Sequence, residues 1–405
     1  MPPLKNLPAR TKRPGDEYVY GNAIPFVLAH LVCFAAIWTG VHAADLLIAV
    51  ALYVVRMFGI TAGFHRYFAH RGYKTGRVFG FILAFLGQTS AQSGVLWWAG
   101  NHRHHHRFSD TDEDVHSPVK RGFWFAHLGW IFTKRYERTD MTLIPDFAKY
   151  PELVWLDRHP FLPAILLAVG VLAAAGWSGL VVGFFWSTVA LWHGTFAINS
   201  LAHVIGRKRY LTGDESRNNW WLAILTLGEG WHNNHHHFQS AACQGFRWYE
   251  IDISYYVLKA LAAVGVVREL RRPPAPVVRN EQRLGRIVVE KAAGELAASF
   301  KIDPIVAELR ASLDTLQDDW AARVEAWRHQ FDEKVETVRH DLEEMLAGVH
   351  LPAMPTVADL RERAGAMFVG NPSANDIVER ARQILLENLC LELTRQPIPV
   401  KASQR

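Results

Sequence analysis

Residues 228–237 read GEGWHNNHHH, which places four imidazoles within six positions of a chain that is half hydrophobic. Histidine is rarely needed for packing, and crowding imidazoles together costs desolvation energy unless something binds them. Neutral imidazole is the commonest metal ligand in proteins. The stretch therefore predicts a metal site, provided that histidines elsewhere complete it.

Three further stretches complete it: HRYFAH at 65–70, NHRHHH at 101–106 and NSLAH at 199–203. Helical residues three or four apart share a face, so His102 can bind one metal together with His105 or His106, and 232–236 repeats this spacing. Nine imidazoles are too many for one centre and suit a pair of metals. The candidate ligands are His65, His70, His102, His105, His106, His203, His232, His235 and His236.

The elements that must position these clusters are apolar. Segments 23–40, 44–62, 161–177 and 180–198 are each long enough to span a bilayer, and short turns join them into two hairpins. A fifth apolar segment, 78–98, is interrupted by QTSAQSG and is expected to lie along the membrane surface. Each histidine cluster follows the end of an apolar segment. The expected fold is an all-α membrane protein with four transmembrane helices in two hairpins and a cytosolic helical cap holding a dimetal site.

Lysine and arginine occur in the N-terminal tail, in the 63–160 connection and after residue 198, but not in the hairpin turns. The positive-inside rule then places both termini and the histidine clusters in the cytoplasm. Clusters beyond the ends of the spans argue against a metal transporter, which would need histidines at mid-depth. The sequence pI of about 9.1 arises from dispersed basic residues, so it favours a membrane surface over nucleic acid as partner.

The chain changes character near residue 270. We expect a tail over 1–22, a membrane domain over 23–270, a linker over 271–280 and a charged helical extension over 281–405. An eleven-residue hydrophobic period over 303–348 predicts a long helix able to form a coiled coil, and a second helix is expected over 375–393. The two helices either form a hairpin within the chain or drive homo-oligomerisation.

HRYFAH, HRHHH and HNNHH resemble the three histidine boxes of membrane-bound fatty acid desaturases. GEGWHNNHH, NSLAH and NHRHHHRFSDTDEDVHSP resemble the acyl-CoA Δ9, or stearoyl-CoA, branch of that family, over about residues 23–270. The resemblance implies two iron ions held by the nine histidines at the cytosolic face, with Asn199 contributing through water. It implies O2-dependent insertion of a cis double bond, expected at Δ9, into a long-chain acyl thioester or acyl lipid.

Iron is expected although imidazoles bind zinc more tightly, because zinc cannot perform the redox chemistry that an unactivated methylene demands. One feature departs from the acyl-CoA branch: Gly100-Asn101 replaces its Arg-Asp pair, which leaves open a lipid-bound or carrier-bound acyl chain as substrate. Trp97, Trp98 and Trp231 either line the acyl path or belong to the interfacial belt. Lys120 and Arg121 either hold an anionic headgroup or face the membrane surface.

The carboxylates beside the boxes have simpler interpretations. Asp110, Asp112, Glu113 and Asp114 are expected to form a solvated turn, whereas Glu229 either orients an imidazole or caps a helix. A lipid or alkane hydroxylase on the same di-iron scaffold is the alternative function. No fused cytochrome b5, ferredoxin or rubredoxin pattern is present, so a separate donor of one of these types is expected. We hypothesise that the extension docks this donor or drives oligomerisation.

Overall fold

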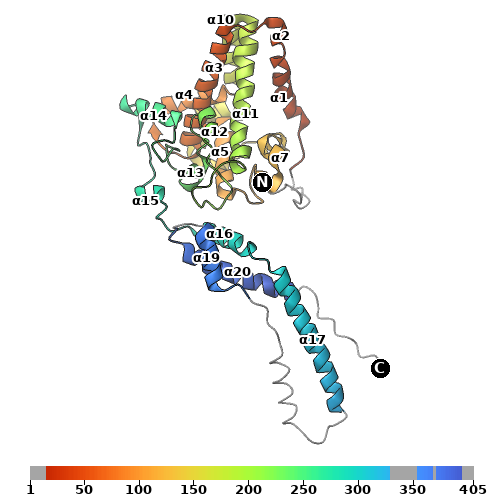
Figure 1. Cartoon of the computed structure of the whole chain (residues 1–405). Coiled ribbons are helices and arrows are strands. Elements are labelled where there is room, and N and C mark those ends of the chain that lie inside the picture. Colours follow the sequence, from red (N-terminus) through yellow and green to blue (C-terminus); the bar gives the residue numbers. More distant parts are fainter. Residues whose placement is uncertain (1–14, 329–353, 368–370, 395–405) are drawn as a thin grey trace. The chain divides into compact units, whose positions relative to one another are not determined.

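Residues 15–279 fold into a bundle of apolar helices that carries a layer of shorter helices at one end (Figure 1). The computed structural model describes residues 15–328, 354–367 and 371–394, and the chain divides into two units, 1–279 and 280–405. Almost all regular structure is helical. The two short strands of the described residues, β1 (Lys74–Thr75) and β2 (Val267–Arg268), pair antiparallel with Lys74 opposite Arg268.

Two continuous helices are long and apolar enough to cross a bilayer. The first covers Ala43–Ala69 with a mean hydropathy of 2.0, and it consists of α3 (Ala43–Phe58) followed by the π-helix η1 (Gly59–Ala69). The second covers Leu162–His203 with a mean hydropathy of 2.3. It comprises α10 (Leu162–Ser178), the π-helix η5 (Gly179–Trp186), α11 (Ser187–Ser200) and the 3-10 turn η6 (Leu201–His203). The expected helical membrane fold is confirmed to this extent.

The second long helix is bent. Its 42 residues would extend about 63 Å if straight, roughly twice the hydrocarbon core of a bilayer. Gly176 interrupts it with φ 65° and ψ −162°, a conformation that costs glycine little because it has no Cβ. α10 consequently packs against η5, which also contacts α3. The first apolar segment, Ala23–Thr39, has only 17 residues and is divided between α1 (Tyr20–Cys33) and α2 (Ala36–Thr39).

Helix α4 (Arg77–Gln88) crosses η1 at close range. A Cβ on Gly59 would lie 2.8 Å from the backbone nitrogen of Gly87, and a Cβ on Gly87 would overlap the ring of Phe64. Phe64, Phe68 and Leu83 are buried in the core that this crossing creates. The interruption expected within segment 78–98 is observed, since α4 ends at Gln88 and α5 (Val95–Phe108) begins after six intervening residues. The crossing fixes the position of η1, which carries the first histidine box.

Short helices form the layer at the end of the bundle. They are α6 (Pro118–Arg121), α7 (Phe123–His127), η2 (Gly129–Phe132), η3 (Lys134–Tyr136), η4 (Met141–Leu143), α8 (Pro145–Ala148), α9 (Pro151–Arg158), α12 (Trp220–Leu225), α13 (His232–His237), α14 (Ile253–Ala263) and α15 (Ala275–Val278). Helix α15 falls within the segment expected to be a linker. Its Val277 is buried, and the Tyr210 hydroxyl donates a 2.8 Å hydrogen bond to the carbonyl of Val278.

The second unit contains four described helices: α16 (Arg286–Ala298), α17 (Asp303–Arg328), α19 (Val357–Met367) and α20 (Ala374–Thr394). Helix α20 packs against α16 and α19. The helix expected over 303–348 is observed up to Arg328, and the rest of it lies outside the described residues. The helix expected over 375–393 is observed as α20.

Candidate metal centre

Five histidines from three elements converge on one point. They are His65 of η1, His70 directly after it, His102 and His106 of α5, and His235 of α13, and one nitrogen of each lies within 4.8 Å of all the others. The Nε2 atoms of His65 and His235 are 3.0 Å apart, and those of His235 and His106 are 2.9 Å apart. His102 Nε2 lies 3.0 Å from the Nε2 atoms of both His70 and His106. These residues are called the five-histidine group.

Four more histidines form a second group beside the first. His105, His203, His232 and His236 are all buried and again offer nitrogens within 4.8 Å of one another. His203 Nε2 lies 3.1 Å from His232 Nε2. The rings of His106 and His236, one from each group, have centroids 4.3 Å apart. The structure therefore brings together all nine histidines that the sequence singles out, as two adjacent groups.

Buried carboxylates hold the outward nitrogens of these rings. The Nδ1 atoms of His105, His203 and His236 lie 2.8 Å from Asp114, 2.9 Å from Asp110 and 2.6 Å from Asp214. His65 Nδ1 contacts Glu229 in the same way. A carboxylate at Nδ1 keeps the proton on that nitrogen and turns the Nε2 lone pair towards the centre of the group.

This arrangement of donors fits bound cations. Neutral imidazoles whose Nε2 lone pairs face one another at about 3 Å repel, and a cation between them converts that repulsion into ligation. The Nε2 atoms of His105 and His236 are buried and have no hydrogen-bond partner among the described residues. Imidazole suits first-row metals such as iron, zinc and copper. The nine histidines are therefore able to hold two metal ions side by side.

The carboxylates are ionised. Burial by itself would raise the pKa of Asp114, but the attraction and hydrogen bond of His105 outweigh it and lower that pKa to about 2. The same competition, with His203 and His236 as partners, lowers the pKa of Asp110 and Asp214 below the usual range. Together with Glu229 they supply four negative charges, which offset the four positive charges of two divalent cations in a buried site.

Two of these carboxylates correct the sequence interpretation. Asp110 and Asp114, expected in a solvated turn, are 4% and 0% exposed, whereas Asp112 has a side chain 82% exposed. Asp214 is buried as well, and its sequence neighbours do not single it out. No local pattern marks these residues, because the partner of Asp110 is His203, 93 positions further along the chain. Glu229 contacts His65 and also accepts hydrogen bonds from Arg66. Of its two sequence interpretations, orienting an imidazole therefore holds and capping a helix does not.

The expected water-bridging residue and the three tryptophans have different surroundings. Asn199 is partly exposed near the end of α11, one helical turn before His203. Trp98 stacks on the ring of His102 with a centroid distance of 4.9 Å. Trp97 instead stacks on Trp130 and donates to the carbonyl of Tyr136, while Trp231 donates to the carbonyl of Ile251. Only Trp98, of these three, stacks directly on a ring of the metal groups.

Lys120 and Arg121, the two basic residues considered for binding a lipid headgroup, each pair with a carboxylate. Lys120 Nζ lies 3.4 Å from Asp112, and the Arg121 guanidinium lies 2.9 Å from Asp16 and over the ring of Phe125. Two histidines without an assigned role point elsewhere: the Nε2 of His104 lies 3.0 Å from the carbonyl of Glu113, and His237 stacks on Tyr210.

Comparisons with known proteins agree with the site. The family model for fatty acid desaturases matches residues 36–270. The sn-1 stearoyl-lipid 9-desaturase of Anabaena variabilis is 36% identical over 266 residues, 65% of this chain and 97% of that protein. The chloroplastic palmitoyl-monogalactosyldiacylglycerol delta-7 desaturase of Arabidopsis thaliana is 37% identical over 56% of this chain and 62% of its own length. An acyl-CoA 5-desaturase of Anemone leveillei is 35% identical over 60% of this chain and 77% of its own.

The chain belongs to the fatty acid desaturase family and is an oxidoreductase of lipid metabolism. The similar proteins include both acyl-lipid and acyl-CoA desaturases, so the similarity does not single out the acyl-CoA branch. Their names also differ in the position of the double bond.

Proposed function

We propose that this desaturase uses O2 to introduce a cis double bond at Δ9 of a long-chain acyl group. The observation that carries the proposal is the pair of adjacent histidine groups, five and four rings, each aimed at its own centre. In the overall reaction a –CH2–CH2– unit, O2, two electrons and two protons give –CH=CH– and two waters. Two iron ions, when bound, supply the redox chemistry that hydrogen removal from an unactivated methylene requires.

The residues of the chain would hold the two iron ions and orient the histidine rings that bind them. The five-histidine group would bind one iron, and His105, His203, His232 and His236 the other, with Asn199 acting through a water. Asp110, Asp114, Asp214 and Glu229 keep the ligand rings in the tautomer that presents Nε2. Their burial also keeps the ionic environment of the centre free of bulk water.

We further propose that the acyl chain is carried by a glycerolipid. Gly100-Asn101 stands where the acyl-CoA branch has an Arg-Asp pair, so a charged contact to a CoA phosphate is absent from that position. Several similar proteins are named for lipid-bound acyl chains. Trp98, beside His102, would line the acyl path. Trp97 and Trp231 would support its walls, and Lys120 and Arg121 would lie near the lipid headgroup.

The proposed topology has four spans in two hairpins, with the tail (1–22), the metal centre and the extension (281–405) in the cytoplasm. The bend at Gly176 and the packing of α10 on η5 support one hairpin. The absence of Lys and Arg from the turns supports the orientation. Electrons would come from a separate ferredoxin, rubredoxin or cytochrome b5.

The proposal is tested by expressing the chain in a desaturase-deficient host and profiling its fatty acids by mass spectrometry. Wild type should yield a monounsaturated acid, with two hydrogens fewer than its precursor and the double bond at Δ9. His235→Ala should yield none, because it removes a ring from the five-histidine group. His104→Ala is the matched control and should behave as wild type, because His104 points away from both groups. A product that has gained one oxygen instead would identify a hydroxylase.

A further inference from the structure

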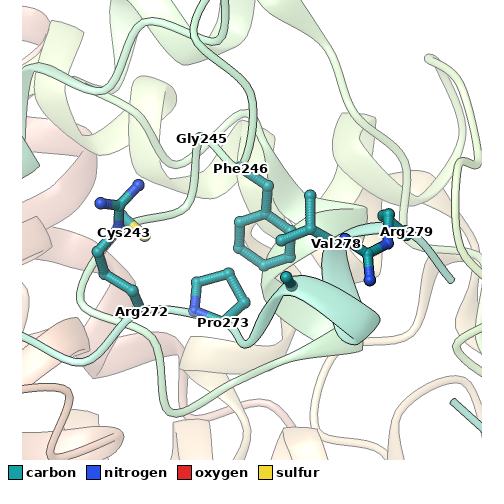
Figure 2. Close-up of a pocket in the computed structure, with 8 residues that line it drawn as sticks. Cys243, Gly245, Phe246, Arg272, Pro273, Val278 and Arg279 are labelled. Atoms are coloured by element: carbon teal, nitrogen blue, oxygen red, sulfur yellow. The ribbon is translucent and has the colours of Figure 1, made fainter. Parts of the chain in front are cut away.

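A pocket of about 320 Å³ opens on the outer surface of the first unit, beside α15. Its apolar part is formed by Cys243, Phe246 and Val278, and Arg272 and Arg279 flank it (Figure 2). In Figure 1, α15 lies beyond α13 and α14, on the side of this unit away from the outer ends of α3 and α10. In the proposed topology the pocket therefore lies on the cytoplasmic side, away from the bilayer.

Hydrogen bonds connect the wall of the pocket to the five-histidine group. Cys243 is followed by Gln244, whose Nε2 donates a 2.6 Å hydrogen bond to Glu229 and lies 3.1 Å from His65 Nδ1. Gln244 and Glu229 are almost fully buried. One peptide unit and one side chain thus separate the pocket surface from a ring that faces the first metal position.

Backbone hydrogen bonds form a second connection to the same group. The backbone N–H of Ala242 donates to the carbonyl of Arg271, and the N–H of Arg271 donates to the carbonyl of Gly72, at 2.8 and 2.9 Å. Gly72 follows His70 by two residues, and a Cβ there would lie 3.1 Å from Ala242. The arginine-bearing segment is therefore held directly against the backbone that carries His70.

The surface around the pocket is basic. Arg247, Arg268, Arg271, Arg272 and Arg279 are exposed. Between residues 240 and 279 the only carboxylates in the sequence are Glu250, Asp252 and Glu269. The first two are buried, and Glu269 pairs with Lys74 at 2.8 Å. Trp248, 91% exposed, adds a large aromatic side chain beside Arg247.

Building on the proposed function, we propose that this surface docks an acidic one-electron carrier protein. Its residues are Arg247, Trp248, Arg271, Arg272 and Arg279, called the arginine surface. Electrons enter through Cys243–Gln244 and Glu229–His65 to the five-histidine group. Each encounter would oxidise the carrier by one electron, which the iron ions, when bound, would take up, so two encounters would supply the two electrons of one turnover. Transient redox complexes are small and depend on charge complementarity for rapid encounter, as this surface offers.

The test uses the full-length holoenzyme in phosphatidylcholine nanodiscs, with an acidic plant-type [2Fe–2S] ferredoxin as the protein donor and reduced methyl viologen as a small cationic donor. Arg272→Glu/Arg279→Glu reverses two charges on the arginine surface. Lys134→Glu/Arg138→Glu is the matched control, because it reverses two exposed charges elsewhere on the same unit. Arg247→Glu alone gives a milder variant should the double variant fold poorly.

Since like charges brought together at an interface cost several kcal/mol, the KM for ferredoxin should rise at least about tenfold in the double variant. Its kcat at saturating ferredoxin and its viologen-driven turnover should stay within about twofold of wild type, because the arginines touch neither histidine group. Salt should raise the ferredoxin KM of wild type and of the control, and should have less effect on the variant.

An unchanged ferredoxin KM overturns the proposal. So does an equal fall in viologen-driven turnover, because the arginines would then serve the catalytic unit itself. A defect that appears only in nanodiscs containing phosphatidylglycerol would assign the arginines to lipid binding and also overturn it. Direct binding of ferredoxin to immobilised wild type and variant is measured separately. It stays interpretable if wild type forms no desaturated product with either donor, an outcome that would instead refute the proposed function.

Discussion

Four of the nine clustered histidine rings of this desaturase contact a carboxylate that fixes their tautomer. In the described part of the chain, Asp110, Asp114, Asp214 and Glu229 each contact the Nδ1 of one histidine, and they come from three different stretches of sequence. Removing a carboxylate would cost the orientation of one ring and one of the four negative charges that would offset two bound cations. Such outer partners typically change metal affinity or activity by about 10- to 100-fold.

We expect Asp214→Asn to lower metal affinity or turnover by about 10- to 100-fold, because an amide keeps the shape of the side chain but loses its charge on His236. Metal content after dialysis against a chelator and initial desaturation rates provide the measurement. Asp112→Asn is the control, since the Asp112 side chain is 82% exposed and contacts no histidine ligand. Equal losses in the two variants would contradict the role given to Asp214.

At the scale of elements, Arg66 joins three segments around the first histidine box. Its side chain is 1% exposed, and it donates to Glu229, to Asp252 and to the carbonyl of Ala242 at 2.8–3.1 Å. Asp252 in turn caps α14 by accepting from the N–H of Tyr255. The π-helix η1, the third box and α14 are thus held by one buried cation.

Arg66→Met should destabilise the protein by about 3–5 kcal/mol, because it leaves two buried carboxylates without their cation. The free energy of unfolding in detergent, from chemical denaturation, is the measurement. Lys74→Met removes an exposed partner of Glu269 and should change stability little. A small effect of Arg66→Met would mean that the carboxylates are neutralised by protonation instead.

Gly87→Ala should also destabilise, by about 1–3 kcal/mol, because the new Cβ would overlap Phe64 next to His65. Gly170→Ala is the matched helical control: nothing lies within 4 Å of its Cβ position, so alanine should be neutral or stabilising there. Thermal unfolding of the two purified variants distinguishes them. If Gly87→Ala melts with wild type, the close crossing of α4 and η1 is not required.

At the scale of the whole molecule, the metal groups and the arginine surface both lie in the first unit, and residues 281–405 belong to the second. Of the two roles hypothesised for the extension, self-association is therefore the one compatible with a donor that docks on the first unit. The eleven-residue hydrophobic period of the sequence over 303–348 is the feature that favours it.

Deletion of residues 281–405 should leave metal content and the KM for ferredoxin within about twofold of wild type, because the histidine groups and the arginine surface are retained. The deletion should reduce the oligomer size, because it removes the segment proposed to self-associate. Light scattering of the detergent complex gives the size, and ferredoxin-driven turnover gives the KM. A large rise in KM would place the donor on the extension. Unchanged size and unchanged turnover would refute both hypothesised roles.

The sequence by itself determined which histidines gather and the helical character of the chain. Histidine has few reasons to cluster at helical spacing beside apolar segments, so residue type and spacing were sufficient to identify all nine rings. The interruption of segment 78–98 and helix α20 were predicted for similar local reasons. The number of membrane spans could not be determined from the sequence, because the length and hydropathy of a segment do not show where its helix bends.

Only the tertiary structure decided how the rings divide. His102 and His106 join one group while His105 joins the other, and His232 and His236 are separated from His235 in the same way. At about 100° per residue, positions four apart differ by about 40°, so α5 and α13 each present such a pair to one centre and the remaining ring to the other. The roles of Asp110 and Asp214 were also beyond the sequence, because a contact such as that of Asp110 with His203 joins residues 93 positions apart, and only packing brings such residues together.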